Sequence, residues 1–367
     1  MACSCSERVY NFSAGPAVLP LKVLEEAQRD LICYPGAGAS IMELSHRGKV
    51  LDAIFKDAEA RMLRLIGAPE GYHVLFLQGG ATTQFSMVPM NFLGEHGAVY
   101  IEEGTWSKKA AAEAKKCGKV DMAWSGKEGN YSHIPADSEY TIRADADYFH
   151  YTSNETIHGI EFHHIPDTHG VPIVCDMSSD FLSKPFDVTK YGLIYAGAQK
   201  NIGPAGVTVV IISDEFYKRA IPNDKLPIML DIHTAVENRS LYNTCPVWGI
   251  YIIDLVLKWI EEDMGGLKGV EKNNIVKAQY IYDAIDSSDG YYKPHSDKES
   301  RSLMNITWNM ATEELEKTFI AEAAEAGFAS LKGHRSIGGL RASVYNAFPV
   351  EGAEKLAQFM AEFKKKH

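Results

Sequence analysis

The sequence predicts an α/β protein in which helices wrap a large, mostly parallel sheet of seven strands, followed by a smaller α+β domain. Two observations lead to this fold class. Between about residues 20 and 260, short apolar runs alternate with stretches of helical periodicity, as in a parallel sheet with crossover helices. Beyond residue 260 the pattern changes to long helices with only a few strands, which indicates a second, smaller core.

The strands of the large sheet are predicted from short apolar runs that polar residues and turn signals interrupt. In chain order they are His73–Leu77, Ala98–Ile101, Lys119–Trp124, Tyr148–Tyr151, Ile173–Cys175, Leu193–Tyr195 and Val207–Ile212. These seven runs are enough for one large sheet.

A long helical stretch, Val247–Ile285, follows the last of these strands. Its apolar residues are three to four positions apart, so we expect one helix that bridges two domains. After it, strands near Leu303–Trp308 and Leu340–Val344 and helices over 312–326 and 352–365 predict the smaller domain. No internal repeat or low-complexity segment interrupts this order.

Composition narrows the range of partners. The chain has 367 residues, 46% of them hydrophobic and 23% charged, which is enough for two domains with cores. A formal net charge of −11 and the lack of a basic stripe argue against nucleic acid. No apolar run approaches the ~18 residues that a membrane helix needs, and no signal peptide is recognisable. We therefore expect neither nucleic acid nor membrane as a partner.

Cysteine and histidine usage predicts a reducing, cytoplasmic setting without a metal site. No Cys-x-x-Cys pair occurs; we expect Cys3 and Cys5 in a flexible tail, and Cys33 and Cys175 as small core residues. The histidines between 158 and 169 straddle turn residues and lack the spacing of a metal site, so this segment predicts a turn between strands.

A lysine and an aspartate each follow an apolar run. Lys200 comes after the small residues 196–198, which leave it unshielded, and Asp176 ends the run 171–176. Lysine is rarely buried without a partner or a chemical role, and ligands bind at the carboxyl ends of strands in open α/β sheets. A lysine that forms a Schiff base, beside an aspartate that holds a pyridinium nitrogen, is the minimal apparatus for pyridoxal phosphate (PLP). A solvated lysine and a helix-capping aspartate remain open as alternatives.

Two further features suit the same cofactor. Gly79 and Gly80 separate a predicted strand from a helix start, which aims free backbone N–H groups at an anion such as phosphate. Trp106 follows the strand Ala98–Ile101 and can lie face-on against a flat ring. A plain turn and a half-buried core tryptophan are the alternatives. Neither G-x-G-x-x-G nor a Walker lysine is present, which disfavours dinucleotides and nucleoside triphosphates.

Seven motifs follow one another from about residue 8 to the C-terminus. They are Asn11–Pro16, Ser45–Lys49, Gln78–Ala81, Ser153–Ile157, Asp176–Ser179, Gly197–Pro204 and His334–Ser343. In this order they resemble the phosphoserine aminotransferases, and the first and last motifs are the most specific. The resemblance implies fold type I of PLP enzymes, with a large PLP-binding domain over residues 17–258. A small domain would combine residues 1–16 and 259–367.

The resemblance also implies roles around the cofactor. Lys200 would form the Schiff base and then carry the proton between substrate and cofactor, while Asp176 would hold the pyridine nitrogen. Thr156 would bond the phenolate oxygen of the ring, on which Trp106 would stack. The implied phosphate contacts are Gly80, Ala81 and Gln199 from the same chain, and Asn243 and Thr244 from the neighbouring subunit of a homodimer.

Arginines must bind anionic substrates in a protein of net negative charge. Arg341 is our expectation for the α-carboxylate, because a guanidinium fork matches a carboxylate. The distal phosphate or γ-carboxylate would lie against His46, Arg47, His334 and Arg335. In some family members an arginine follows the glycine pair; here that position is Ala81, so one phosphate contact lacks a counterpart.

The reaction that the resemblance implies transfers the amino group between glutamate and 3-phosphohydroxypyruvate, giving 2-oxoglutarate and phosphoserine for serine biosynthesis, with ping-pong kinetics. The nearest alternative is another fold type I aminotransferase, acting on serine or alanine with glyoxylate. A cysteine desulfurase needs a mobile cysteine late in the chain, whereas the last one here is Cys245. A nucleotide-binding oxidoreductase and a scaffold without activity are the alternatives from other classes.

Overall fold

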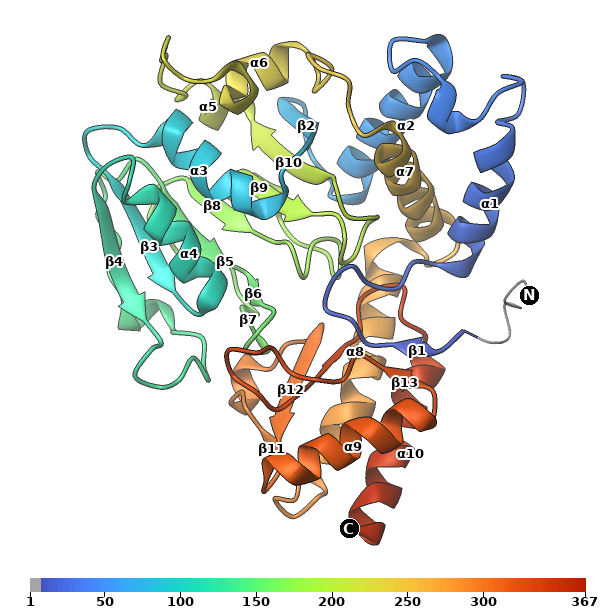
Figure 1. Ribbon diagram of the computed structural model, residues 1–367. Coiled ribbons are helices and arrows are strands. Elements are labelled where there is room, and N and C mark those ends of the chain that lie inside the picture. The colour runs from blue at the N-terminus through green and yellow to red at the C-terminus, as the bar shows by residue number, and fades with distance from the viewer. Residues whose placement is uncertain (1–7) are drawn as a thin grey trace.

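The computed structural model describes residues 8–367, which form a large part around a seven-stranded sheet and a small part beside it (Figure 1). The order of strands across the large sheet is β2-β10-β9-β8-β5-β3-β4. Their bounds are β2 (Tyr72–Leu77), β3 (Ala98–Glu102), β4 (Val120–Ser125), β5 (Phe149–Thr152), β8 (Ile173–Asp176), β9 (Tyr191–Gly197) and β10 (Thr208–Ser213). All seven predicted strands are therefore confirmed.

The large sheet is parallel except for β10, which pairs antiparallel with both β2 and β9. Along β10, Val209 and Ile211 belong to the core on one face, while Val210 and Ile212 belong to the core on the other. Both faces are thus buried, which explains why these strands are continuous apolar runs rather than alternating ones.

Helices cover the two faces of the large sheet. On one face lie α3 (Gly80–Phe92) and α4 (Thr105–Ala114), together with the short helices α5 (Asp214–Tyr217) and α6 (Ile232–Glu237). On the other face lie α1 (Leu21–Ile32), α2 (Lys49–Leu65) and α7 (Val247–Glu262). The fold class predicted from the sequence is confirmed by this arrangement.

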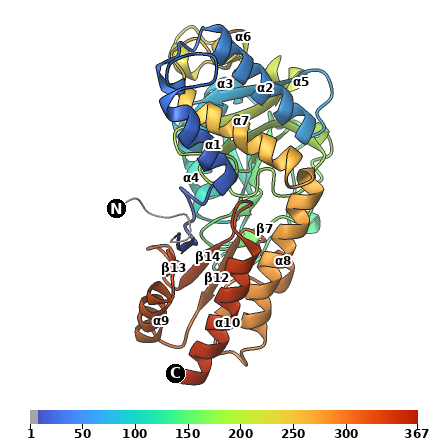
Figure 2. The same cartoon turned by 90° about the vertical axis from the view of Figure 1, so that its right-hand side faces the viewer.

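The predicted single helix over 247–285 is wrong, because two helices occupy this stretch. Helix α7 ends at Glu262, and a second helix, α8 (Gly266–Asp286), leads from the large part into the small part (Figure 2). Gly265 and Gly266 have φ values of +73° and +71°, in the left-handed region that favours glycine. The predicted domain boundary between 258 and 259 falls inside α7, and the division into domains stays a prediction.

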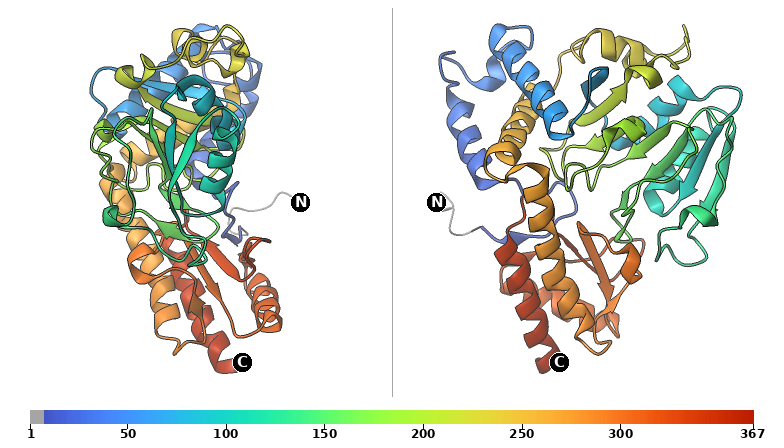
Figure 3. Two further views of the ribbon diagram at one scale, coloured as in Figure 1. Left: turned by 90° about the vertical axis from the view of Figure 1, so that its left-hand side faces the viewer. Right: turned by 180° about the vertical axis from the view of Figure 1, so that it is seen from behind.

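The small part has its own sheet and core. Its strands are β11 (Lys293–Pro294), β12 (Asn305–Asn309) and β14 (Leu340–Ser343), all antiparallel, and its further helices are α9 (Glu313–Glu325) and α10 (Val350–Lys366). At the other end of the chain, β1 (Tyr10–Asn11) pairs with β13 (Phe328–Ala329), and Phe12 is buried in this core. The start of the described chain therefore lies against its C-terminal part (Figure 3).

The cysteine expectations are met in part. Cys175 is buried as predicted, whereas Cys33 is exposed. Helix α1 buries Val23, Ala27 and Asp30, and Cys33 follows its last turn away from that face, in an extended conformation. Cys3 and Cys5 lie outside the described residues. No helix within residues 8–367 has the length and apolar character needed to cross a membrane.

Candidate active site

Asp176 is the last residue of β8, at the carboxyl edge of the parallel strands. It is buried, and its Oδ1 accepts a hydrogen bond of 2.9 Å from the backbone N–H of Ser178. The hydroxyl of Ser178 in turn accepts from the N–H of Gly197, at the end of β9, at 3.1 Å. Burial raises the pKa of Asp176, while Ser178 and Lys200 oppose that rise. The carboxyl group is therefore fixed in place beside the next strand end.

Lys200 lies in the turn after β9, and its Nζ donates a 2.6 Å hydrogen bond to Oγ1 of Thr156. Burial lowers the pKa of Lys200 to about 8, opposed by the Asp176 and Glu155 carboxylates and helped by Arg341. A lysine of this pKa is partly a neutral amine near neutral pH, and only the neutral amine attacks a carbonyl. The structure thus brings together Lys200, Asp176 and Thr156, as expected from the sequence.

The N-terminal motif lies against the lysine turn. Gly15 has a φ of +130°, and a Cβ atom there would lie 3.3 Å from Cγ of both Gln199 and Lys200. The backbone N–H of Ala17 donates to the carbonyl of Gln199 at 2.9 Å. A segment far away in sequence therefore supports the residue that carries the amine.

The glycine pair forms the start of α3, as predicted. Gly79 is the N-cap residue with a φ of +95°, and a Cβ atom there would lie 2.0 Å from Oγ1 of Thr83. Gly80 also has a positive φ, +70°, and has open space around its Cα. The first N–H groups of this 13-residue helix lack intrahelical partners and favour an anion. Ala81 follows Gly79 and Gly80 and lies in the first turn of α3.

Trp106 occupies the second position of α4, directly beyond β3. Its backbone N–H donates to Oε2 of Glu155 at 2.9 Å, and its indole Nε1 has no partner. Nζ of Lys109, one turn later, lies 4.3 Å from the centroid of the indole ring, which is a cation–π contact.

A group of cationic side chains lies close to Thr156 and Trp106. Nη1 of Arg341, on β14, donates to the carbonyl of Thr156 at 3.3 Å. Burial lowers the pKa of His334, and the nearby charges of Arg341, Arg335 and Lys109 lower it further. Arg341, His334 and Arg335 are thus near one another, as expected for residues that bind an anionic substrate. The positive charges of Arg341, Arg335 and Lys109 around His334 favour an anion at this place.

Four predicted residues do not reach this group within the chain. His46 and Arg47 lie in the turn before α2, where Arg47 is exposed and no described contact joins either to Lys200 or Arg341. Thr244 is exposed in the segment before α7, and Asn243 donates instead to Oε1 of Gln78 in its own chain at 2.9 Å.

Three residues near the site were missed by the sequence analysis. Ser178 and Lys109 had usable signals, since Asp-x-Ser is a turn pattern and Lys109 is three positions after Trp106 on a helix. The sequence around Glu155 gave no signal of burial, because an acidic residue between Asn154 and Thr156 is typical of an exposed turn. The structure buries it completely.

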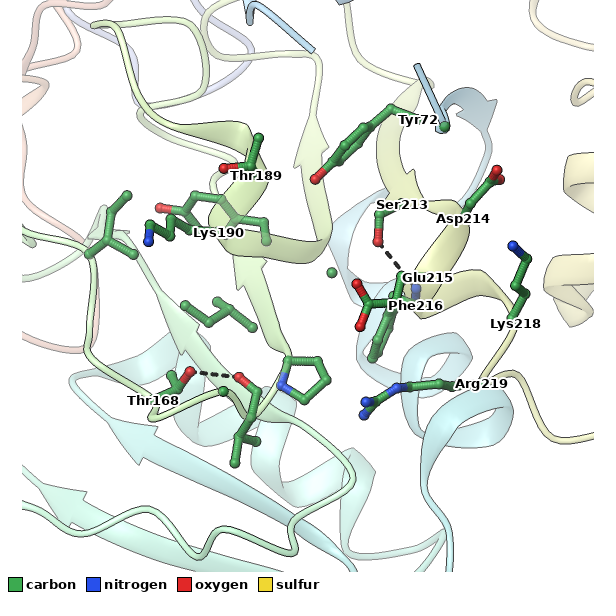
Figure 4. Close-up of a pocket in the computed structure, with 18 of the residues that line it drawn as sticks. Tyr72, Thr168, Thr189, Lys190, Ser213, Asp214, Glu215, Phe216, Lys218 and Arg219 are labelled. Carbon is green, nitrogen blue, oxygen red and sulfur yellow. Dashed lines mark hydrogen bonds between the residues drawn. The ribbon is translucent and has the colours of Figure 1, made fainter. Parts of the chain in front are cut away.

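A cavity of about 940 Å³ lies on the side of the sheet opposite to the active site, where strands β2 and β9 begin (Figure 4). Its lining includes Tyr72 and Tyr191, at the starts of β2 and β9, and Thr168, Glu215 and Arg219 also border it. Ligands of parallel α/β sheets bind at the carboxyl ends of the strands, so this cavity is not the place of the reaction.

The residues at the carboxyl edge fit a flat, phosphorylated aldehyde cofactor. The amine of Lys200 has one hydrogen-bond partner, the buried Asp176 supplies a carboxylate, and Trp106 keeps an unpartnered indole N–H. The glycine-lined start of α3 supplies the N–H groups that a phosphate needs.

Comparison with known proteins agrees with this geometry. Residues 9–356 match the aminotransferase class-V family, so the fold and the site define an aminotransferase of class V. A relative from Niallia circulans named phosphoserine aminotransferase is 54% identical over 361 residues, covering 98% of this chain and 99% of the relative. The chain belongs to the phosphoserine aminotransferase family.

Solved structures support the same family. That of phosphoserine aminotransferase from Bacillus circulans subsp. alkalophilus has a TM-score of 0.95 at 53% identity, covering 98% of this chain and 99% of the other. A PLP-bound phosphoserine aminotransferase from Trichomonas vaginalis has a TM-score of 0.91 at 40% identity, covering 96% and 100%. Alanine–glyoxylate aminotransferase from Nostoc sp., at 13% identity, a TM-score of 0.78 and coverage of 97% and 95%, shares the fold alone.

Proposed function

We propose that this enzyme transfers the amino group between glutamate and 3-phosphohydroxypyruvate, giving 2-oxoglutarate and phosphoserine. The observation that carries this reaction is that Lys200 and Arg341 both donate hydrogen bonds to Thr156, while the Asp176 carboxylate is close enough to act on the charge of Lys200. An amine and a buried carboxylate suit amino-group transfer, and the cationic side suits substrates that carry two anionic groups. The two half-reactions share one site, so ping-pong kinetics should follow.

The cofactor is pyridoxal 5′-phosphate, which supplies an electron sink for bond changes at the substrate's α-carbon. In our proposal Asp176 holds the proton on the pyridine nitrogen, and Thr156 bonds the phenolate oxygen. Lys200 would remove the proton from the substrate's α-carbon and, as general acid, deliver a proton to C4′, the aldehyde carbon of the cofactor. Trp106 covers the ring and excludes water from one side. Gly80, Ala81 and Gln199 bind the phosphate.

Arginine geometry assigns the ends of the substrate. Arg341 binds the α-carboxylate in our proposal, because burial has already removed part of its hydration and Thr156 orients it. His334 and Arg335 then bind the distal phosphate or γ-carboxylate, together with His46 and Arg47. Lys109 adds positive charge close to His334.

We propose that the active form is a homodimer whose subunits share each site. The apolar residues Ile228 and Met229 are each 48% exposed, close to a cavity of about 360 Å³ that Tyr242 and Asn243 also line. Ile228, Met229 and Tyr242 are all exposed and line this one cavity, and apolar residues exposed together favour a protein contact. Such a contact would bring Asn243 and Thr244 to the phosphate of the partner's cofactor. It would also explain why His46 and Arg47 lie away from their own Lys200.

We further propose that the enzyme works in the cytoplasm. The described cysteines, 33, 117, 175 and 245, are all free thiols, and free thiols are typical of a reducing compartment.

A half-reaction assay tests the substrate assignment against the rival aminotransferase that uses serine or alanine with glyoxylate. The PLP-loaded enzyme is mixed with phosphoserine, glutamate, serine or alanine, and the loss of its visible absorbance is followed. Phosphoserine and glutamate should react with a far higher second-order rate constant than serine or alanine. A preference for serine or alanine would overturn the proposed substrate.

A further inference from the structure

We propose that Glu155 is a positioning residue with two separate effects, one on Trp106 through a hydrogen bond and one on Lys200 through its charge. This role presupposes that Lys200 carries the cofactor as proposed above. Glu155 ends the short strand β6 (Asn154–Glu155), which pairs with β7 (Ile160–Glu161), and its side chain is completely buried. The next residue, Thr156, accepts the hydrogen bond of Lys200.

The first effect concerns the start of α4. The N–H groups of a helix's first turn need acceptors, and the N-cap residue here, Gly104, has no side chain to supply one. Oε2 of Glu155 accepts from the N–H of Trp106 at 2.9 Å, and a carboxylate is favourable at a helix N-terminus. Glu155 therefore caps a helix of a different segment, and so fixes the backbone that carries the indole ring.

Gly104 shows that the fold keeps space for this contact. A Cβ atom at residue 104 would lie 2.3 Å from Cγ and 2.6 Å from Cδ of Glu155. Its φ of 176° is an extended conformation that any residue adopts, so the backbone does not require glycine. The space taken by Glu155 is the reason for a glycine here.

The second effect is electrostatic. Burial raises the pKa of Glu155 to about 7, and the N–H of Trp106 and the charge of Lys200 oppose that rise. The negative charge of Asp176 raises the pKa of Glu155 further. The charge of Glu155 in turn raises the pKa values of the buried Glu103 and of Tyr131. The other oxygen, Oε1, is buried without a partner. Above neutral pH the charge on Glu155 thus favours a proton on the nitrogen of Lys200.

Two variants separate these effects. Glu155→Gln keeps the length and an acceptor oxygen for Trp106 but removes the charge. We expect the pH midpoint of the cofactor's visible absorbance, which reports the proton on the Lys200 nitrogen, to fall by about one unit. The dissociation constant of PLP should stay within about twofold of wild type. Glu155→Asp keeps the charge but is too short to reach Trp106, so that dissociation constant should rise roughly five- to tenfold. Its pH midpoint should stay near that of wild type.

Matched controls complete the experiment. Glu102→Gln removes a carboxylate at the end of β3 that accepts from the hydroxyl of Tyr131 at 2.5 Å, and it should change neither quantity. Gly104→Ala removes no carboxyl group but displaces that of Glu155, because the added Cβ atom would lie 2.6 Å from its Cδ, so it should raise the dissociation constant as Glu155→Asp does. An unchanged midpoint in Glu155→Gln, or an unchanged dissociation constant in Glu155→Asp or Gly104→Ala, would overturn the role of Glu155. A wild-type enzyme that shows no visible cofactor absorbance would instead contradict the proposed function.

Discussion

Among single residues, the ionisable groups at the carboxyl ends of the parallel strands have pKa values that differ from those in water. Burial lowers the pKa of Lys200 and raises those of Asp176 and Glu155, while the attraction between Lys200 and each carboxylate opposes these changes. These opposing effects leave the pKa of Lys200 at about 8 and that of Glu155 at about 7. Both groups can therefore exchange protons near neutral pH, as acid–base catalysis requires.

Asp176→Asn should separate catalysis from cofactor binding. An asparagine keeps an Oδ1 that can accept the N–H of Ser178, so the turn should hold its shape. It cannot keep a proton on the pyridine nitrogen, so the electron sink weakens. We expect kcat to fall by orders of magnitude with PLP still bound, measured by steady-state kinetics and by absorbance. A change confined to PLP affinity would show that Asp176 is only structural.

Arg335→Ala and Arg341→Ala should differ in how they affect the two amino-acid substrates. A phosphate monoester carries more charge and more acceptor oxygens than a carboxylate, so Arg335 should matter more for phosphoserine than for glutamate. Loss of a charge-assisted hydrogen bond costs about 1.5–3 kcal/mol, or roughly ten- to a hundredfold in kcat/KM. Arg341→Ala should impair both substrates alike, because both have an α-carboxylate. Equal losses for both substrates in the Arg335 variant would contradict this division.

Among the residues of the site, the sequence predicted those whose chemical type and position stand out. Lys200 and Asp176 follow apolar strands, and the structure places them together. The helical spacing allows Lys109 to lie near Trp106, but a lysine at such a position is commonly solvated. The structure shows its Nζ over the Trp106 ring. The burial of Glu155 depends on a contact with α4, 49 positions away along the chain, which no local pattern contains.

At the scale of helices and strands, apolar runs predicted the strands well, but helical periodicity did not locate the break between α7 and α8. The apolar pattern continues through both helices, while the left-handed conformation of Gly265 and Gly266 ends one and begins the other. The break lets α7 pack on the large sheet and α8 on α10 of the small part. The pair Gly265–Gly266 was a usable signal for this break, because a Gly-Gly dipeptide marks a turn, whereas only isolated glycines are tolerated within helices.

Helix α8 contributes a fully buried lysine to the contact with the segment after β14. Nζ of Lys277 donates to the carbonyl of Tyr345 at 2.6 Å, and Asn346 in that segment donates its N–H to Oδ1 of Asn201, next to Lys200. Burial lowers the pKa of Lys277 from 10.5 to about 7. Lys277 thus supports, within the small part, the segment whose Asn346 contacts Asn201 of the large part.

Lys277→Met should change how stability depends on pH. Between pH 7 and 10.5 the unfolded chain keeps the Lys277 proton that the folded protein has lost. The free energy of unfolding of wild type should therefore rise with pH in this window, by up to about 1.4 kcal/mol per unit, and level off below pH 7. The variant lacks this contribution, so the difference between the two proteins should grow in favour of wild type from pH 7 to 9. Urea unfolding at several pH values measures it; a constant difference would contradict the lowered pKa.

For the molecule as a whole, the sequence predicted the mostly parallel sheet and its helices because each strand has its own apolar signal. It could not predict from composition which segments meet in space. The pairing of β1 with β13 joins residues more than 300 positions apart, and the Asn243 contact with Gln78 joins two segments across a cavity rim. The proposed contacts between subunits leave even weaker signals in the sequence, since nothing in the sequence distinguishes an exposed apolar residue such as Met229 from a buried one.

Shared sites in a homodimer predict complementation between two inactive variants. Lys200→Ala lacks the amine, and the double variant Asn243→Ala, Thr244→Ala lacks the proposed contacts to the partner's phosphate. If each site takes its lysine from one chain and its Asn–Thr pair from the other, a mixed dimer contains one complete site. Activity should return after subunit exchange. Its absence, with mixed dimers confirmed by mass spectrometry, would place Asn243 and Thr244 in their own chain's site or outside any site.

The central claim is that Lys200 carries the cofactor, and covalent trapping tests it most directly. The PLP-loaded enzyme is reduced with borohydride and digested, and the peptides are searched by mass spectrometry for the added pyridoxyl phosphate group. The added mass should occur on the peptide that contains Lys200, and it should disappear in Lys200→Ala. Modification of another lysine, such as the half-buried Lys184 or the buried Lys277, or no modified peptide at all, would contradict the account.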